Sequence, residues 1–199
     1  HISIIGNVGS GKTTLLKLLV NFIEPTSGVI WLDTFSTREI APDFLRTHIH
    51  YMSSDCNIFR GSILDNLKIA NQQATSDEII NAAKLSGVED LALKSQRGYE
   101  MLLDEKGENI SSGQRQSICL ARAILSQADI ILLDEPTAYL DLTNGILQMK
   151  NFFDFCNHKT ILMVTHRLDL CQLTERSIFF KDGCVAMDGK TDDVIRDFM

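Results

Sequence analysis

The chain has 199 residues, of which 44% are hydrophobic and 23% charged, and its formal net charge is −7. This composition is typical of a globular protein with one domain, or one domain and a small subdomain. The acidic balance argues against a general nucleic-acid surface, because phosphate binding needs a basic footprint, so no nucleic-acid partner is expected. No apolar run approaches the roughly 20 residues that cross a bilayer.

The first predicted elements enclose a glycine-rich loop. Residues 2–5 are apolar and predict a strand, residues 6–13 read GNVGSGKT, and residues 13–22 predict a helix with an apolar side that includes Phe22. This order and spacing fit the P-loop pattern GxxxxGK[ST], in which backbone N–H groups and the positive end of the helix face phosphates. Lys12 is expected to reach the β- and γ-phosphates, and the Thr13 hydroxyl is expected to bind Mg²⁺. The residues expected to bind nucleotide here are Gly6, Asn7, Val8, Gly9, Ser10, Gly11, Lys12, Thr13 and Thr14.

Further along the chain, apolar strands alternate with helices. In order, we expect a strand at 29–32, a helix at 42–47, a strand at 49–52, helices between 61 and 93, a helical run at 117–125, a strand at 130–133, a helix at 143–156, a strand at 160–164, a hairpin of strands 177–180 and 184–187, and a helix at 191–199. This alternation predicts an α/β fold, a P-loop NTPase core with a mostly parallel sheet flanked by helices. No convincing strand is expected between 52 and 130, so residues of about 55–115 are predicted to form a helical subdomain inserted in that core.

Two acids follow the apolar run 130–133. Ligands gather at the carboxyl ends of strands in a parallel sheet, so Asp134 and Glu135 are placed where a nucleotide would lie. Asp134 is expected to hold Mg²⁺ directly or through water. Glu135 is expected to polarise a water molecule in line with the γ-phosphate.

Four ordered motifs resemble those of ATP-binding cassette (ABC) proteins, and they cover essentially the whole chain. Residues 109–116 (NISSGQRQ) resemble the signature motif, and residues 132–137 (LLDEPT) resemble the Walker B segment with its catalytic glutamate. Residues 138–141 (AYLD) are similar to the D-loop, and residues 164–167 (VTHR) to the switch-histidine segment. The catalytic residues implied are Glu135, His166 and Lys12.

Three other segments narrow the resemblance to exporters. Residues 59–67 and 104–107 are similar to exporter patterns, and residues 188–195 look most like those of bacterial type I secretion ATPases. Such a protein hydrolyses ATP to ADP and phosphate with Mg²⁺, and it works at the cytoplasmic face of the cell membrane with the transmembrane domain of the same transporter. Residues 1–199 are then the nucleotide-binding domain of a longer chain, with the N-terminal β-subdomain largely absent.

The resemblance also implies a composite site. Two such domains, identical or not, sandwich two ATP molecules head to tail, so that each γ-phosphate meets one P-loop and the signature of the other chain. Ser111 and the amides that follow begin a helix, and they offer a hydroxyl, N–H groups and a positive helix end to phosphate. The residues implied on this side of the nucleotide are Ser111, Ser112, Gly113, Gln114 and Asp141.

Two positions depart from the family pattern. Ser54 stands where a glutamine that reaches Mg²⁺ and the attacking water is usual, and the shorter serine needs a bridging water to serve as a metal ligand. Ser112 replaces the first glycine of the signature pair, and its side chain restricts the backbone near the phosphate. Because Lys12, Asp134, Glu135 and His166 are all present, we expect a working ATPase. The sequence leaves open whether the two serines lower its turnover.

Three alternatives stay open at this point. The chain could be a soluble ABC-type ATPase in nucleic-acid or ribosome-linked work, or its cargo could be a lipid or drug rather than a protein or peptide. A P-loop small-molecule kinase is a third reading, but it gives no reason for the signature or the His166 segment.

Overall fold

The computed structural model describes residues 1–198, and these residues form two compact units. The first unit comprises residues 1–51, 128–134 and 159 onward, and the second comprises residues 52–127 and 135–158. The predicted boundaries of about 55–115 for an inserted helical subdomain stay a prediction. In the part of the chain that is described, no helix is both long and apolar enough to cross a membrane.

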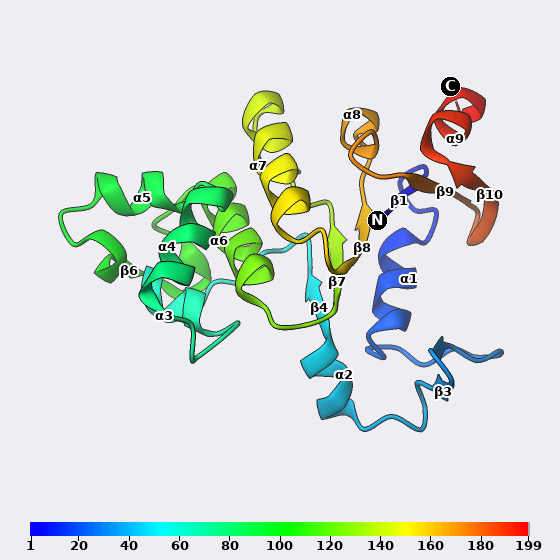
Figure 1. Cartoon of the computed structure of the whole chain (residues 1–199), viewed down its shortest axis with the longest axis horizontal. Coiled ribbons are helices and arrows are strands. Elements are labelled where there is room, and N and C mark those ends of the chain that lie inside the picture. Colours follow the sequence, from blue (N-terminus) through cyan, green and yellow to red (C-terminus); the bar gives the residue numbers. More distant parts are fainter. Residues whose placement is uncertain (199) are drawn as a thin grey trace. The chain divides into compact units, whose positions relative to one another are not determined.

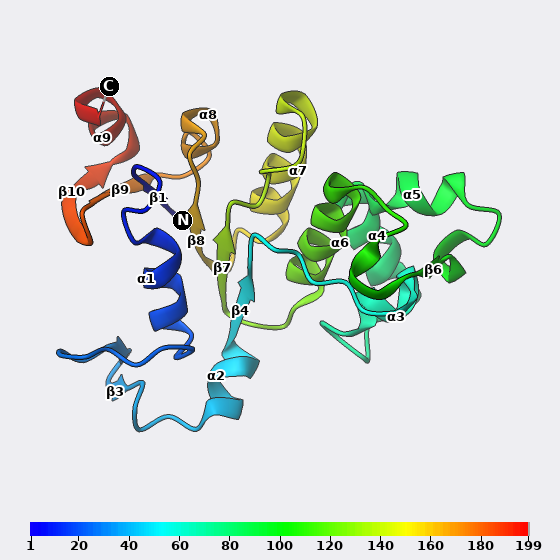
Figure 2. The ribbon, with the colours of Figure 1, turned by 180° about the vertical axis from the view of Figure 1, so that it is seen from behind.

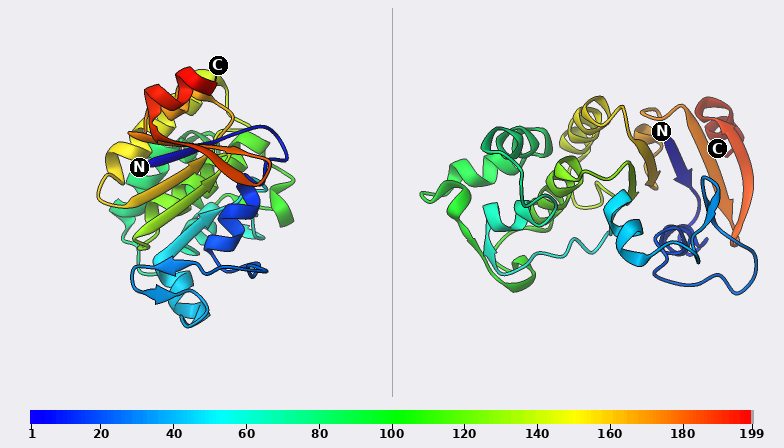
Figure 3. Two further views of the ribbon diagram at one scale, coloured as in Figure 1. Left: turned by 90° about the vertical axis from the view of Figure 1, so that its right-hand side faces the viewer. Right: turned by 60° about the horizontal axis from the view of Figure 1, so that its bottom comes forward.

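The first unit is built on a six-stranded sheet. Its strands are β1 (Ile2–Ile5), β4 (Ile49–Met52), β7 (Ile130–Asp134), β8 (Thr160–Val164), β9 (Arg176–Lys181) and β10 (Cys184–Lys190). They follow the order β10-β9-β1-β8-β7-β4 (Figures 1 and 3). Strand β1 is parallel to β9 and to β8, β7 is parallel to β8, and β10 is antiparallel to β9. The predicted α/β fold with a mostly parallel sheet is therefore confirmed.

Helices and a small ribbon complete this unit. They are α1 (Lys12–Leu19), the two-stranded ribbon of β2 (Trp31–Leu32) and β3 (Phe35–Ser36), α2 (Pro42–His48), α8 (Leu168–Cys171) and α9 (Thr191–Phe198). One buried cluster joins α1 and α2 to the sheet, and its members are Ile4, Leu16, Leu45, Ile49, Leu132, Val164 and Phe180. A second cluster lies under α9, which packs beside β9 and β10 in Figure 3, and it consists of Ile5, Cys171, Val194 and Ile195.

The second unit is mainly helical. Its elements are β5 (Gly61–Ser62), α3 (Ile63–Lys68), α4 (Ser76–Ser86), α5 (Val88–Lys94), η1 (Gly98–Glu100), β6 (Leu102–Leu103), η2 (Glu105–Gly107), α6 (Ser112–Leu125) and α7 (Leu142–Phe155). Helix α6 is buried from Gln116 to Leu125, and α3, α4 and α5 surround it (Figure 2). Serine or threonine caps begin α3, α4 and α6, each with a reciprocal bond from the third helical residue.

Two expectations for local structure are wrong. The first helix ends at Leu19, because Asn21 adopts a left-handed conformation (φ 56°) and the Asn21 and Phe22 N–H groups bond back to Leu18 and Lys17. Phe22 is therefore outside the helix and 62% exposed. The region between 52 and 130 does contain strands, because β5 and β6 pair over two residues each.

The core of the first unit gives a stability prediction. Leu16 is fully buried against the sheet, so Leu16→Ala removes apolar contacts and leaves a cavity, and it should lower the free energy of unfolding by about 2–5 kcal/mol. The exposed neighbour Lys17 provides the control, because Lys17→Ala should change that free energy by less than about 0.5 kcal/mol. Denaturant unfolding of the purified protein measures both, and equal effects would contradict this description of the core.

Candidate nucleotide-binding and hydrolysis site

The loop between β1 and α1 is held in a tight conformation by its own lysine. Lys12 is 6% exposed, and its Nζ donates to the carbonyl oxygens of Gly6 (2.8 Å) and Asn7 (2.9 Å). Gly11 caps α1 in the left-handed region (φ 102°), which glycine adopts without steric cost. The positively charged Lys12 ammonium group and the N-terminal end of α1 therefore both lie at the loop of residues 6–11.

Phe180 of β9 leaves no space for a side chain at Gly6 and little space at Gly11. A Cβ at Gly6 would lie 2.1 Å from the carbonyl oxygen of Phe180, and one at Gly11 would lie 3.2 Å from the Phe180 ring. The N–H of Gly183, in the turn between β9 and β10, donates to the Ser10 carbonyl (3.0 Å). The predicted hairpin of strands 177–180 and 184–187 is confirmed, and its turn at Asp182-Gly183 is bonded to the P-loop.

The polar groups of the loop fit a phosphate. The Ser10 hydroxyl is buried and makes no hydrogen bond within residues 1–198, which is costly for a hydroxyl that has no ligand to bond. An ammonium group, backbone N–H groups and hydroxyls are the donors that phosphate oxygens require. The residues present therefore fit the phosphates of a nucleoside triphosphate.

A second set of polar atoms lies at the end of β7. The Thr13 hydroxyl donates to Asp134 Oδ2 (2.9 Å), and the Tyr51 hydroxyl donates to the same oxygen (3.2 Å). Asp134 is 1% exposed. Hydroxyl and carboxylate oxygens are the ligands that Mg²⁺ prefers, so Thr13 and Asp134 fit a shared metal ion. The predicted pair is brought together, whereas Tyr51 had no predicted role at this site.

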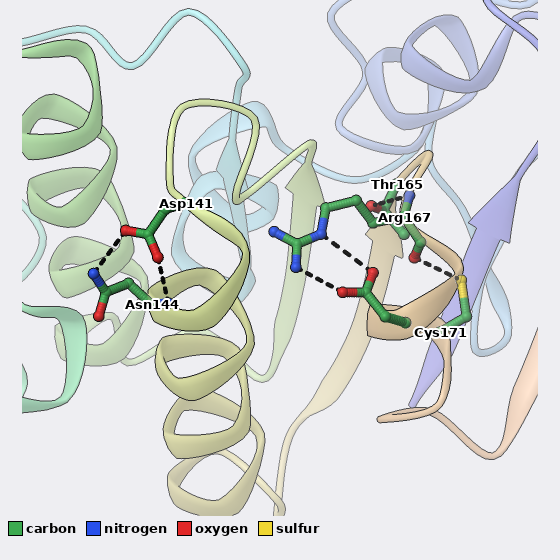
Figure 4. Close-up of polar contacts among 6 residues, drawn as sticks. Asp141, Asn144, Thr165, Arg167 and Cys171 are labelled. Carbon is green, nitrogen blue, oxygen red and sulfur yellow. Dashed lines mark hydrogen bonds and ion pairs between the residues drawn. The ribbon is translucent and has the colours of Figure 1, made fainter.

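The turn after β8 carries the predicted histidine, His166. The Thr165 N–H donates to the Ile4 carbonyl (3.2 Å). The Arg167 N–H donates to Thr165 Oγ1 (3.1 Å) (Figure 4). Arg167 also forms a two-point ion pair with Asp169, so both neighbours of His166 are fixed. Partial desolvation, followed by the positive charge of Lys12, lowers the pKa of His166 below 6.5. The imidazole next to the P-loop is therefore neutral at pH 7.

In the second unit, the signature residues form the cap of α6. Ser111 Oγ accepts the Gln114 N–H (3.2 Å), and Gln114 Oε1 accepts the Ser111 N–H (2.8 Å). The Ser111 hydroxyl accepts this bond through its oxygen, which leaves its own proton to donate to a ligand. Ser111 is exposed, and Ser112 and Gly113 are half-buried in the first turn.

The second unit also holds the two predicted acids of the Walker B and D-loop segments. Glu135 has a left-handed backbone (φ 51°), and its carbonyl accepts a bond from the buried Gln116 side chain (2.8 Å). Asp141 caps α7 by accepting from the N–H (3.0 Å) and side-chain amide (2.7 Å) of Asn144, and these bonds lower the pKa of its carboxyl (Figure 4). Gln116, like Tyr51, was not among the predicted site residues.

The predicted site residues thus fall into two groups. The first unit brings together the P-loop residues 6–14, Asp134 and His166, and the second unit holds Ser54, the signature residues 111–114, Glu135 and Asp141. Ser54 is half-buried, and its role as a metal ligand stays a prediction. Tyr51 and Gln116 were missed because their side-chain bonds join residues distant in sequence: Tyr51 bonds Asp134, and Gln116 bonds Glu135 and Tyr139. The only signal for Tyr51 is its place near the end of a predicted strand, and that for Gln116 is its place beside the signature.

Comparison with known proteins identifies the family. The sequence pattern of the ABC transporter family matches residues 1–138. The chain belongs to the ABC transporter family. The predicted enzyme class, an ABC-type ATPase that binds ATP, is confirmed by this match and by the relatives described next.

The relatives include secretion proteins. The chain is 40% identical over 195 residues to the lactococcin-A transport/processing ATP-binding protein LcnC of Lactococcus lactis subsp. lactis, covering 98% of this chain and 27% of that protein. It is 33% identical over 189 residues to the alpha-hemolysin translocation ATP-binding protein HlyB of Escherichia coli O6:H1, covering 95% of this chain and 27% of HlyB. The chain thus spans about a quarter of the length of these relatives.

A solved structure supports the exporter class. The chain superimposes on a bacterial Atm1-family ABC exporter with ATP bound, with a TM-score of 0.92 and 26% identity, covering 100% of this chain and 35% of the exporter chain. Together with the secretion relatives, this match confirms the predicted resemblance to ABC exporters and type I secretion ATPases.

The lowered pKa of His166 predicts how kcat/KM for ATP hydrolysis falls at low pH, which is the acid limb of its pH profile. Because the neutral imidazole gains its proton only below pH 6.5, kcat/KM should stay level down to about that pH and fall at lower pH, where a second cation beside Lys12 is unfavourable. His166→Gln should lower kcat/KM by about 10²-fold and remove this limb from the residual activity.

The exposed His158 serves as the control for this profile, because His158→Gln should leave it unchanged. The test is a measurement of kcat/KM against pH for the unsubstituted protein, His166→Gln and His158→Gln. An acid limb centred above pH 6.5, or one that persists in His166→Gln, would refute the assignment.

Proposed function

We propose that this chain is the motor domain of a membrane exporter, which hydrolyses ATP to ADP and phosphate and drives a cargo across the membrane. The observation that supports this most is the contact between Thr13 and Asp134, beside a P-loop whose lysine is buried. This contact supports the proposal because the two proposed metal ligands lie together beside the proposed phosphate-binding loop, at one edge of the sheet. The chain's similarity to exporter and secretion proteins is consistent with this role.

Each residue has a physical role in this reaction. Lys12 leaves the carbonyls of Gly6 and Asn7 and turns to the β- and γ-phosphates, where its charge balances theirs. Thr13 and Asp134 would hold Mg²⁺, which would supply positive charge to balance the charge on the phosphates. Glu135 accepts a proton from the attacking water, and neutral His166 bonds the γ-phosphate and helps orient that water. These are the roles predicted from the sequence for the same residues.

In this proposal, the signature residues contact a nucleotide that is bound by a second cassette. Ser111 and the first turn of α6 present a hydroxyl proton and N–H groups to solvent, and the family arrangement puts them against ATP held by another cassette. The partner is therefore a second nucleotide-binding domain in a head-to-tail dimer, and closure on ATP followed by reopening after hydrolysis is the switch.

The similarities support a transmembrane partner and a polypeptide cargo. The exporter relatives cover far more sequence than this chain, so we place the motor at the cytoplasmic face of the cell membrane, attached to a transmembrane domain of the same transporter. The two named secretion relatives handle a lactococcin and a hemolysin, which favours a peptide or protein cargo over a lipid or drug.

Removal of the proposed base tests the reaction. Glu135→Gln should lower kcat by about 10²-fold or more while ATP still binds, so two cassettes should stay associated with ATP and Mg²⁺. Retained nucleotide and kcat measure this in the purified protein, and the same variant should keep its polypeptide cargo inside the cell. The exposed Glu100→Gln makes the same chemical change as a control and should behave like the unsubstituted protein. Full turnover by Glu135→Gln would overturn the role of Glu135.

Complementation tests the shared site in a protein whose two cassettes are both copies of this chain. Lys12→Ala removes the phosphate charge, and Ser111→Arg blocks the signature turn, so each variant alone should lose about 10²-fold or more of its turnover. A mixed dimer contains one site with an intact P-loop and an intact signature, so turnover should reappear when the two variants are co-expressed. No recovery in the isolated mixed dimer would contradict a site built from two copies.

A further inference from the structure

The buried amide of Gln116 joins the signature helix to the loop that follows Asp134. Gln116 is 0% exposed, its Nε2 donates to the Glu135 carbonyl (2.8 Å), and its Oε1 accepts the Tyr139 N–H (2.8 Å). All three residues belong to the second unit. One side chain thus holds both ends of the loop 135–139, and its two bonds require the amide in one orientation because a flipped amide would break both.

This loop has little freedom of its own. Glu135 has a φ of 51°, a region that residues other than glycine seldom adopt, and the Ala138 N–H donates to the Glu135 carbonyl (3.1 Å). The Glu135 carbonyl therefore accepts two bonds, one of them from Gln116. Loss of the Gln116 bond removes a contact that holds the backbone of the residue proposed as the base.

A second observation connects the same loop to the signature turn itself. Gly113 lies so close to the loop that a Cβ on it would be 2.9 Å from the Tyr139 carbonyl oxygen. The first turn of α6 and the loop are thus in contact at van der Waals distance, and Gln116 bonds them one turn further along. Because packed atoms do not compress, a displacement of the signature turn displaces the loop as well.

We propose that Gln116 is a positioning residue for ATP hydrolysis: it fixes Glu135 relative to the signature turn, so that seating of this turn on a nucleotide is transmitted to the glutamate. The inference rests on the proposed function. In the proposed dimer, Ser111–Gly113 meet the ATP of the partner cassette while Glu135 serves the ATP of its own chain. Gln116 then couples the two ATP sites through a single amide.

The test replaces this amide by an apolar side chain of similar length in the whole protein that carries the chain. Gln116→Met should lower kcat by about 10²-fold, because a displaced base loses in-line geometry, while the Kd for ATP changes by less than about twofold. Cooperativity of turnover with respect to ATP should also fall. Gln148→Met makes the same change at a half-buried glutamine of the same unit, and it should leave kcat, Kd and cooperativity as they are.

A double-mutant cycle separates positioning from a purely structural role. If Gln116 acts through Glu135, adding Gln116→Met to Glu135→Gln should cause no further loss of the residual turnover. Gln116→Glu supplies a second variant of nearly the same shape: it keeps an acceptor for the Tyr139 N–H but places an oxygen against the Glu135 carbonyl, so kcat should fall with Kd unchanged.

The outcomes are distinct for the two proposals. The positioning role would be overturned if kcat stayed unchanged in Gln116→Met and Gln116→Glu. It would also be overturned if the losses caused by Gln116→Met and Glu135→Gln multiplied in the double variant. In either case, ATP hydrolysis by the unsubstituted protein would leave the proposed function intact. Absence of ATP hydrolysis in the unsubstituted protein would overturn the proposed function, and the inference with it.

Discussion

The register of three parallel strands is the constraint on which the nucleotide site depends. Ile4 of β1 and Asp134 of β7 both pair with Val164 of β8, so the three residues form one row across the sheet. Just beyond this row, β1 is followed by the P-loop, β7 by Glu135 and β8 by the turn that contains His166. A slip of β7 by one residue would turn Asp134 to the opposite face and separate it from Thr13. Chemistry at this edge thus requires correct pairing of strands that lie far apart in sequence.

Those parts of the molecule that depend on local pattern could be predicted from the sequence. The strands at 2–5, 49–52 and 160–164 have the predicted bounds, because short apolar runs between turn signals have few other conformations. The Asp182-Gly183 turn was equally predictable, because both residues adopt positive φ as a tight hairpin requires. The contact of Thr13 with Asp134 followed from one rule, the convergence of ligands at the carboxyl ends of parallel strands.

Side-chain bonds between distant segments could not be predicted in the same way. Tyr51 has the pattern of a residue in a strand, and nothing in its neighbours indicates that its hydroxyl bonds Asp134. Phe22 has the spacing of a buried helical residue, yet the left-handed Asn21 ends the helix before that spacing applies. A bond over 83 residues is decided by the packing of the whole unit, and hydrophobic periodicity carries no information about it.

Helix α6 organises the second unit through buried polar side chains. Arg122 donates to the carbonyls of Asn66 (2.8 Å) and Asn57 (2.6 Å), and its guanidinium lies 5.6 Å from the centre of the Phe59 ring. Burial lowers the pKa of Arg122, which shows the cost of holding a charge away from water. Such a group is tolerated only where fixed acceptors surround it, so Arg122 ties the segment after Ser54 to the helix that begins at the signature. Through Arg122 and Gln116, helix α6 thus bonds both the segment after Ser54 and the loop 135–139.

This organisation also explains why a serine is accommodated in the signature pair. Ser112 is the first residue of α6, where the backbone is helical and open to any L-residue, and its side chain is half-buried. Gly113 is different, because a Cβ there would press on the Tyr139 carbonyl oxygen at 2.9 Å and displace the loop of Glu135. The glycine that the fold requires is therefore the one that is retained. The fold does not require a glycine at residue 112, so Ser112 leaves the link from α6 to Glu135 unchanged.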